Sequence, residues 1–215
     1  MANTLPVLDL ISAEMRAVVA KSNELAADAY DTSADLPALR AGYNLERRFW
    51  NEGGPVMAST TDVTVPTPAG PVAIRCHRPP AAPGVSPAIV YIHGGGFVLG
   101  NLATHDRIMR ILAEETGAVV VGVDYALSPE AKFPVALHQC AGVVQWLQAH
   151  GAGLGIDPAR LACAGDSGGA MLSLATFLYL RDQGAAEPLR ALLLYYGLYG
   201  LTDSASRRLL GGPWD

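Results

Sequence analysis

The chain has 215 residues, of which 50% are hydrophobic and 16% are charged, a composition that can bury the core of one substantial domain. Its formal net charge of −5 at pH 7 argues against nucleic acid and anionic membrane surfaces as partners. The N-terminus has no basic region followed by an apolar block, and no run of about twenty uncharged apolar residues occurs, so neither a signal peptide nor a spanning helix is expected.

The first 55 residues are predicted to be helical. Met15, Val18, Val19 and Ser22 stand at the spacings i, i+3, i+4 and i+7, which place them on one face of a helix. A second helix is expected over residues 35–50, with Pro37 in its first turn and the sequence Asn-Glu-Gly-Gly-Pro ending it. From the pattern alone, this helix pair either packs on a core or covers a site.

The next stretch alternates between strands and helices. Two strands at 63–65 and 72–75 are joined by a turn rich in proline and glycine. Apolar runs and helical spacings then predict strands at 88–92, 118–121, 161–164 and 191–195, and helices at 133–150 and 171–180. This alternation implies an α/β fold, with a mostly parallel sheet and helices on both of its faces.

A glycine triplet follows the strand predicted at 88–92. The sequence is His93-Gly94-Gly95-Gly96-Phe97, and three successive glycines leave backbone N–H groups uncovered by any Cβ. Such groups can stabilise a developing oxyanion, and a His-Gly-Gly-Gly pattern after a strand is typical of the oxyanion loop in lipases and esterases. A flexible turn is the alternative for a glycine triplet that occurs alone.

The sequence Gly165-Asp166-Ser167-Gly168-Gly169 joins the strand predicted at 161–164 to the helix predicted at 171–180. A Gly-x-Ser-x-Gly pattern between a strand and a helix predicts a nucleophile elbow, in which a tight turn exposes the serine hydroxyl. The glycine triplet and the elbow occur in the order expected of an acyl-transfer site. Together they predict that Ser167 is a nucleophile.

Three more segments accompany these motifs: residues 101–110 (NLATHDRIMR), 124–130 (DYALSPE) and 196–210 (YGLYGLTDSASRRLL). With them, the chain resembles the hormone-sensitive-lipase-like carboxylesterases of the α/β-hydrolase fold, and among these the bacterial acetyl esterases. The resemblance runs from the first predicted helix to Asp215. It implies hydrolysis of short-chain acyl esters through an acyl-enzyme, without a metal or a cofactor.

The resemblance also assigns residues and segments. Ser167 would be the nucleophile, and the oxyanion hole would involve the loop and elbow residues His93, Gly94, Gly95, Gly96 and Gly168. Residues 1–55 would form an N-terminal helical lid segment, 56–200 an incomplete hydrolase core, and 201–215 the start of a second lid segment. In this fold the acid and then the histidine of the triad follow the serine along the chain.

All five histidines precede Ser167, so the resemblance implies that the triad acid and histidine, with the strands that carry them, are not in this chain. A serine without a base is a poor nucleophile, so the chain by itself is expected to be inactive. The strand at 191–195 would then lie at an open sheet edge. A complementary C-terminal chain or a homo-oligomer is expected to cover it.

Other polar residues near these motifs have structural interpretations. Asp166 is expected to point away from the serine and to stabilise the elbow by a hydrogen bond. Glu130 is interpreted as a buried acid that joins loops around the elbow, and His93 as a neutral imidazole that holds the glycine loop. His105 and Asp106 suggest a dyad, but they precede an ordinary crossover helix.

The remaining sequence features bear on the cellular compartment and on alternative functions. The three cysteines are widely spaced and contain no C-x-x-C pair, which favours free thiols in a reducing cytoplasm. No histidine or cysteine spacing predicts a metal site. Two further classes share these motifs: ligand-binding homologues such as the plant hormone receptors of the family, and serine acyltransferases or peptidases. Hydrolysis of a nitrophenyl ester, and transfer to amine or peptide acceptors, would distinguish them.

Overall fold

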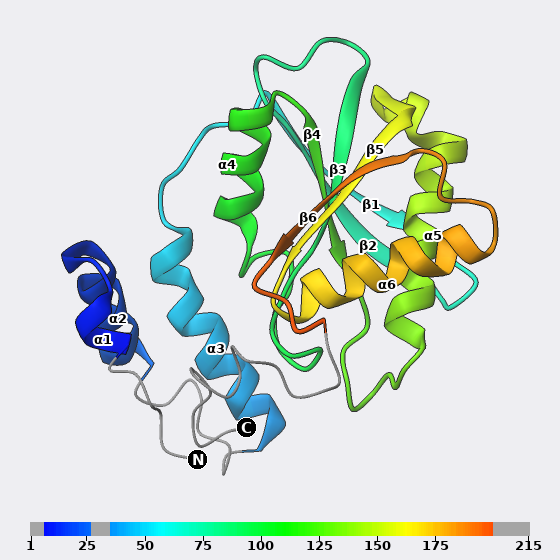
Figure 1. Cartoon of the computed structure of the whole chain (residues 1–215). Helices are drawn as coiled ribbons and strands as arrows, with labels where there is room; N and C mark the ends of the chain where they lie inside the picture. The colour runs from blue at the N-terminus through cyan, green and yellow to red at the C-terminus, as the bar shows by residue number, and fades with distance from the viewer. Residues whose placement is uncertain (1–6, 27–34, 200–215) are drawn as a thin grey trace. The chain divides into compact units, whose positions relative to one another are not determined.

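The computed structural model describes residues 7–26 and 35–199 (Figure 1). These residues fall into two compact units, one that contains residues 7–26, 35–46 and Tyr199 and another formed by residues 47–198. The segment expected to start a second lid, residues 201–215, lies outside the described residues. The lid role expected of residues 1–55 stays a prediction.

The described part of the first unit is helical, as predicted. It contains α1 (Val7–Leu10), α2 (Ala13–Leu25) and most of α3 (Leu36–Asn51). Ser12 caps α2 by accepting a hydrogen bond from the Met15 N–H, and Asp35 caps α3 in the same way at the Ala38 N–H. The predicted apolar stripe of α2 contains no buried residue. The pattern therefore predicted the helix, and left open what its apolar face contacts.

The second unit is built on one mixed sheet. Its strand order in the described chain is β1-β2-β4-β3-β5-β6, with antiparallel pairing of β1 with β2 and of β2 with β4. The other neighbours are parallel. The strands are β1 (Ser59–Val65), β2 (Val72–Arg78), β3 (Ser86–Ile92), β4 (Val119–Asp124), β5 (Ile156–Asp166) and β6 (Leu189–Tyr195). The predicted architecture, a mostly parallel sheet with helices on both faces, is confirmed.

Helices cover the two faces of this sheet (Figure 1). On one face lies α4 (Asp106–Thr116), whose buried Met109 and Ala113 contact alternate residues of β3 and β4. The other face carries α5 (Val135–His150), which a 3₁₀ turn at Gly151–Leu154 follows, and α6 (Gly168–Asp182). Side chains of β3 alternate accordingly, with Val90 and Ile92 facing α5 and α6.

The three cysteines are free and buried in this unit. Burial raises the pKa of the Cys76 thiol to about 11 and that of Cys163 to about 12. It also raises the pKa of Cys140 well above its ordinary value. Cys163 is a small core residue of β5, as predicted, and not part of a site. In the described ranges, no helix combines the length and the apolar character needed to cross a membrane.

Candidate active site

Ser167 lies between β5 and α6, at the edge of the sheet where the parallel strands end. Its backbone has φ 50° and ψ −121°, a positive φ that costs energy for a residue with a side chain. The turn is held from both sides, because the Ser167 N–H donates to the Tyr195 carbonyl at 2.9 Å and the Ser167 carbonyl accepts from Ala170 and Met171. This geometry is that of the predicted elbow.

The flanking glycines let α6 approach β3 closely. A Cβ on Gly165 would lie 2.5 Å from the Ile92 carbonyl oxygen and from the Gly169 carbonyl carbon. A Cβ on Gly169 would overlap the same Ile92 oxygen and lie 2.6 Å from the His93 carbonyl. Real Cβ atoms do not approach backbone so closely, so both positions exclude every side chain.

The glycine loop leaves β3 directly beside the elbow. Gly95 and Gly96 have φ values of 114° and 60°, and a Cβ on Gly95 would overlap the Leu99 carbonyl. The Gly95 carbonyl accepts hydrogen bonds from Val98 and Leu99, which closes the loop. A Cβ placed on Gly168 would lie only 3.4 Å from the Gly96 nitrogen. The loop and the first residue of α6 are therefore neighbours.

The backbone N–H groups of this region differ in availability. The Gly94 N–H donates to Oδ1 of Asp166 at 2.9 Å and is therefore engaged. Within the described chain, the N–H groups of Gly95, Gly96 and Gly168 donate no hydrogen bond. The expectation that Gly94 belongs to the oxyanion hole is corrected on this point, because its donor already has a partner. Gly168 also begins α6, where the helix dipole favours negative charge.

Asp166 is buried beneath the elbow and points away from the serine's surroundings, in line with its sequence interpretation. Its Oδ1 accepts from the Tyr91 hydroxyl at 2.8 Å as well as from the Gly94 N–H, and its Oδ2 lies 3.5 Å from Nε2 of His105. Burial alone would raise the pKa of Asp166, but the interactions with His105, Tyr91 and Gly94 outweigh it and hold the pKa at about 2. The side chain is therefore a carboxylate at neutral pH.

His93 is 2% exposed and shapes the loop from below. Its Nδ1 lies 2.8 Å from the Gly94 carbonyl oxygen, and its ring stacks on Tyr125 with centroids 4.4 Å apart. The Tyr125 hydroxyl donates to the His93 carbonyl at 2.9 Å. Burial is the main cause that lowers the pKa of His93 to about 4, and the nearby His105 is the second cause. The imidazole is neutral, as the sequence interpretation expected.

Two other sequence interpretations have different outcomes. Glu130 is exposed in the segment between β4 and α5, so its description as a buried acid is wrong. His105 and Asp106 do not form a dyad, because they have separate partners. Asp106 accepts from Arg110 at 2.7 Å and lies 3.3 Å from Nε2 of His77, whereas His105 faces Asp166.

None of the histidines serves the serine hydroxyl in this structure, and each is engaged elsewhere. His77 pairs with Thr60 and Asp106, while His138 and His150 pack on the rings of Tyr179 and Trp146. In the described part of the chain, no group of three or more histidine, cysteine, aspartate or glutamate side chains is arranged to hold a metal ion.

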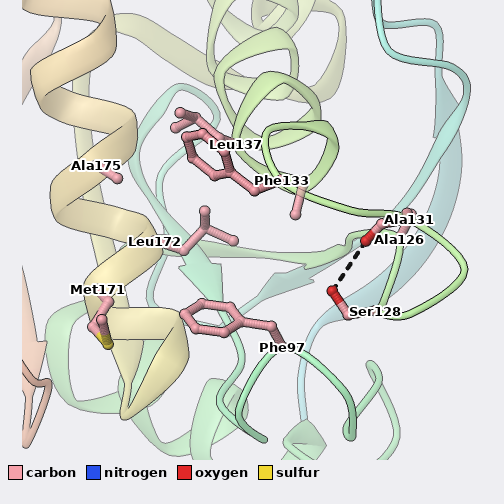
Figure 2. A pocket seen from close by; sticks show the side chains of 10 residues that line it. Phe97, Ala126, Ser128, Ala131, Phe133, Leu137, Met171, Leu172 and Ala175 are labelled. Atoms are coloured by element: carbon pink, nitrogen blue, oxygen red, sulfur yellow. Dashed lines mark hydrogen bonds between the residues drawn. The ribbon is translucent and has the colours of Figure 1, made fainter.

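An apolar cavity of about 310 Å³ opens beside the elbow helix. Figure 2 shows Met171 and Leu172 of α6 along one side, Phe133 and Leu137 across from them, and the ring of Phe97 below. Phe97 follows the glycine loop directly, and Met171 lies in the first turn after Ser167. The cavity therefore begins where the loop and the elbow meet. The Ser128 hydroxyl, which donates to the Ala131 carbonyl at 3.1 Å, is the polar group drawn at its rim.

Sequence reasoning missed two hydroxyl groups of this site. Tyr91 is the last residue but one of β3, and Tyr125 directly follows β4. The Tyr91 hydroxyl donates to Asp166 and the Tyr125 hydroxyl donates to the His93 carbonyl. The available signal was an aromatic residue with a polar tip within an apolar run, since a buried tyrosine hydroxyl needs a partner.

Comparisons with known proteins place this geometry in context. Residues 89–212, more than half of the chain, match the model of a family described as having the alpha/beta hydrolase fold. The chain is 46% identical over 214 residues to an acetyl esterase of Salmonella choleraesuis, which covers 99% of this chain and 65% of that protein. The chain thus spans just under two thirds of this curated relative.

Solved structures of esterases are also similar to this chain. A hyperthermophilic esterase from the archaeon Pyrobaculum calidifontis superposes with a TM-score of 0.81 at 34% identity, over 90% of this chain and 61% of that one. A thermophilic carboxylesterase cloned from a metagenomic library gives a TM-score of 0.75 at 35% identity, over 81% of this chain and 60% of that one. The resemblance inferred from the motifs is confirmed.

Proposed function

The chain belongs to the α/β-hydrolase fold family, and on this premise we propose that it supplies the nucleophile and the oxyanion-binding backbone of a carboxylic-ester hydrolase. One observation carries the proposal: the strained Ser167 elbow lies beside a glycine loop whose Gly95 and Gly96 N–H groups have no acceptor in the described chain. Naming of relatives as acetyl esterase and esterase supports the reaction class.

The reaction proceeds in two acyl-transfer steps. Ser167 Oγ attacks the carbonyl carbon of the ester while a general base takes its proton, and the carbonyl oxygen becomes an oxyanion. The N–H groups of Gly95, Gly96 and Gly168 stabilise this oxyanion. The alcohol leaves with the proton, and water then attacks the acyl-enzyme to release the acid and restore the serine. Each donor of this kind contributes on the order of a hundredfold or more to turnover.

The residues beneath the loop hold geometry and transfer no proton. Asp166 is engaged with Tyr91, Gly94 and His105, and Tyr196 also interacts with it. His93 is neutral, with Nδ1 against the Gly94 carbonyl. They keep the donors in place before the substrate arrives. Preorganised donors cost no rearrangement when charge develops, which is the main reason such holes are effective.

The substrate is proposed to be a short-chain acyl ester. The cavity beside Phe97, Met171 and Leu172 is apolar and lies next to the elbow, so it suits a small hydrocarbon group of the ester. An acetyl to butyryl chain fits within about 310 Å³ without leaving a charge buried there. The acetyl esterase name of the Salmonella relative supports the same range.

The general base and its orienting acid are proposed to come from polypeptide that pairs with β6. Two observations support this. Each of the five histidines is engaged away from Ser167. In the described sheet β6 is an edge strand, and its Ala191 and Tyr195 are exposed. The polypeptide would be a complementary C-terminal chain or a second copy. The three free cysteines favour a reducing compartment such as the cytoplasm for this assembly.

A fluorophosphonate probe tests the nucleophile. We expect the active protein to be labelled once, at Ser167, and Ser167→Ala to abolish both labelling and hydrolysis of 4-nitrophenyl acetate. Ser59→Ala, at an exposed serine of β1, is the matched control and should keep both. Labelling that persists in Ser167→Ala would refute the assignment. Adding an amine acceptor reveals acyl transfer, and ligand binding without any ester cleavage would indicate a binding homologue instead.

A further inference from the structure

His105 and Asp166 form a buried pair that the reaction above does not use directly. Their side chains are 7% and 11% exposed, and Nε2 of His105 lies 3.5 Å from Oδ2 of Asp166. His105 precedes α4 and Asp166 ends β5, so the pair connects the crossover helix to the elbow. The hydrogen-bond partners of the His105 ring determine which of its two nitrogens carry a proton.

The hydrogen bonds of Thr104 determine whether Nδ1 of the His105 ring carries a proton. The Thr104 hydroxyl has a single proton, which it donates to the Asn101 carbonyl at 2.8 Å, and the same oxygen accepts from the Asn101 N–H at 2.9 Å. Nδ1 of His105 lies 2.9 Å from that oxygen. Because the hydroxyl proton is already used, Nδ1 must be the donor in this contact.

The other ring nitrogen faces a carboxylate. Nε2 points at Oδ2 of Asp166, an oxygen that only accepts hydrogen bonds when the group is ionised. A neutral imidazole with its proton on Nδ1 would turn a lone pair toward this negative charge. Both nitrogens therefore need a proton, which makes the ring an imidazolium.

We propose that His105 is a positively charged positioning residue that keeps Asp166 as the acceptor of the Gly94 N–H and so fixes the glycine loop. The inference rests on the proposed function for its catalytic consequence. Gly94 immediately precedes Gly95 and Gly96, and a Cβ on Gly94 would overlap Asp166 itself. The carboxylate thus contacts the loop at the peptide from which the oxyanion donors extend.

The charged and titratable groups around the pair are few in the described chain. Besides Asp166, His105 faces the ring of His93, with centroids 5.3 Å apart, and the ring of Tyr91 at 6.3 Å. On the other side of the pair, the Tyr196 hydroxyl interacts with Asp166. The neutral state of His93 is consistent with a neighbouring positive charge, since the charge on His105 lowers the His93 pKa. The adjacent Asp106 is engaged with Arg110 and His77, so it leaves Asp166 as the counter-ion of His105.

The first experiment reads protons directly. In the protein at pH 7, nitrogen-15 NMR of the histidine side chains should show a bonded proton on both ring nitrogens of His105. A neutral ring, with one nitrogen lacking a proton, would overturn the charge assignment. Amide hydrogen exchange of the segment around Gly94 gives a second readout that needs no activity. His105→Leu should accelerate that exchange, and His150→Leu, at an exposed histidine, should not.

The second experiment separates positioning from folding. For ester hydrolysis, His105→Leu should lower kcat about tenfold or more and change KM by less than about twofold, because the loop donors act mainly in the transition state. His105→Gln, which keeps a donor toward Asp166, should recover a large part of kcat. Tyr91→Phe, which removes one further side-chain donor, should lower kcat less than His105→Leu does. A His105→Gln variant as impaired as His105→Leu, or unchanged kcat and exchange in both, would refute the role. These assays use the protein together with the polypeptide that completes the sheet at β6. If no variant, wild type included, cleaves esters there, the proposed function fails while the NMR and exchange results still decide this inference.

Discussion

The Gly94 amide donates to the Asp166 carboxylate at 2.9 Å, although the two residues stand 72 positions apart in the chain. The bond joins the glycine loop after β3 to the elbow after β5 at the one peptide that precedes the free donors. Since β3 and β5 are hydrogen-bonded neighbours in the sheet, the two motifs form one rigid corner. Their relative position is therefore fixed before any substrate binds.

Gly95→Ala is expected to lower ester turnover on the order of a hundredfold or more. The new Cβ would overlap the Leu99 carbonyl, and the φ of 114° is unfavourable for alanine, so the loop must move. Steady-state kinetics with 4-nitrophenyl acetate, in the protein completed by the polypeptide that pairs with β6, measure the effect. Gly153→Ala, where a Cβ meets nothing within 4 Å, is the control and should keep full activity. Unchanged turnover in Gly95→Ala would remove this loop from the mechanism.

Gly169→Ala is expected to destabilise the fold by about 3 kcal/mol or to prevent folding. Helix propensity alone predicts the opposite, a gain of about 1 kcal/mol, because Gly169 lies within α6. Steric overlap with the Ile92 carbonyl dominates, since that atom belongs to the central strand and cannot move aside. Urea unfolding gives the free energy. A variant as stable as Gly153→Ala would show that α6 can withdraw from β3.

The sequence predicted the scaffold because its signals are local. Apolar runs identified β3 and β4, and the glycines of the elbow marked the junction of β5 with α6. Element ends were less accurate: β5 begins at Ile156 and not at Leu161. Ile156 pairs with Ser86, and the ladder resumes at Leu161 after an irregular stretch that contains Pro158 and Arg160 and has no apolar pattern. For the stripe of α2 the pattern left open what covers it, since periodicity reports a face and not its neighbour, and no residue of α2 is buried.

Stability should decrease as the pH falls from about 6.5 to about 4 through His93. The ordinary pKa of histidine is 6.5 and the pKa of His93 in the fold is about 4. Between these pH values the unfolded chain binds the proton and the folded chain does not, so protonation stabilises the unfolded state and the free energy of unfolding decreases. The loss amounts to about 3 kcal/mol at the lower end. His93→Gln should flatten this part of the curve in urea unfolding. A wild-type curve that is level down to pH 4.5 would contradict the buried neutral state. Asp166, whose pKa is about 2, contributes a loss only below about pH 3.8.

Residues 1–215 purified alone should hydrolyse esters little or not at all. Ser167 has no histidine at hand to accept its proton, and loss of the serine or the histidine of a triad costs about a millionfold in kcat in subtilisin. Intact mass and turnover of the same sample check this together. Robust hydrolysis that Ser167→Ala abolishes would show that one of the five histidines moves to the serine.

The exposed side of β6 should make the same sample self-associate. Edge strands with unpaired backbone and apolar side chains recruit further strands, and Tyr195 is 38% exposed there. Sedimentation should show species larger than the monomer, and Ala191→Lys on β6 should shift them toward the monomer. Ala152→Lys, at an exposed position away from β6, is the control. A wild-type monomer with a cooperative melt would show that the edge is already protected.

The site was predicted less completely than the scaffold, because its decisive contacts are not local. The motifs identified Ser167 and the glycine loop, but the engagement of Gly94 depends on a carboxylate from a distant strand. The pairing of His105 with Asp166 has no sequence signature, since the two side chains meet only after α4 packs on the sheet. Glu130 was misjudged because an acidic residue in a Pro-containing turn looks the same whether covered or exposed.

The three buried cysteines have a practical consequence for anyone who wants to follow this molecule in solution. With thiol pKa values of about 11 and about 12 for Cys76 and Cys163, and a raised one for Cys140, almost no thiolate exists at neutral pH. Maleimide and iodoacetamide should therefore leave the native fold unmodified. A single cysteine introduced on an exposed turn can then carry a fluorophore or spin label, without first removing the natural ones.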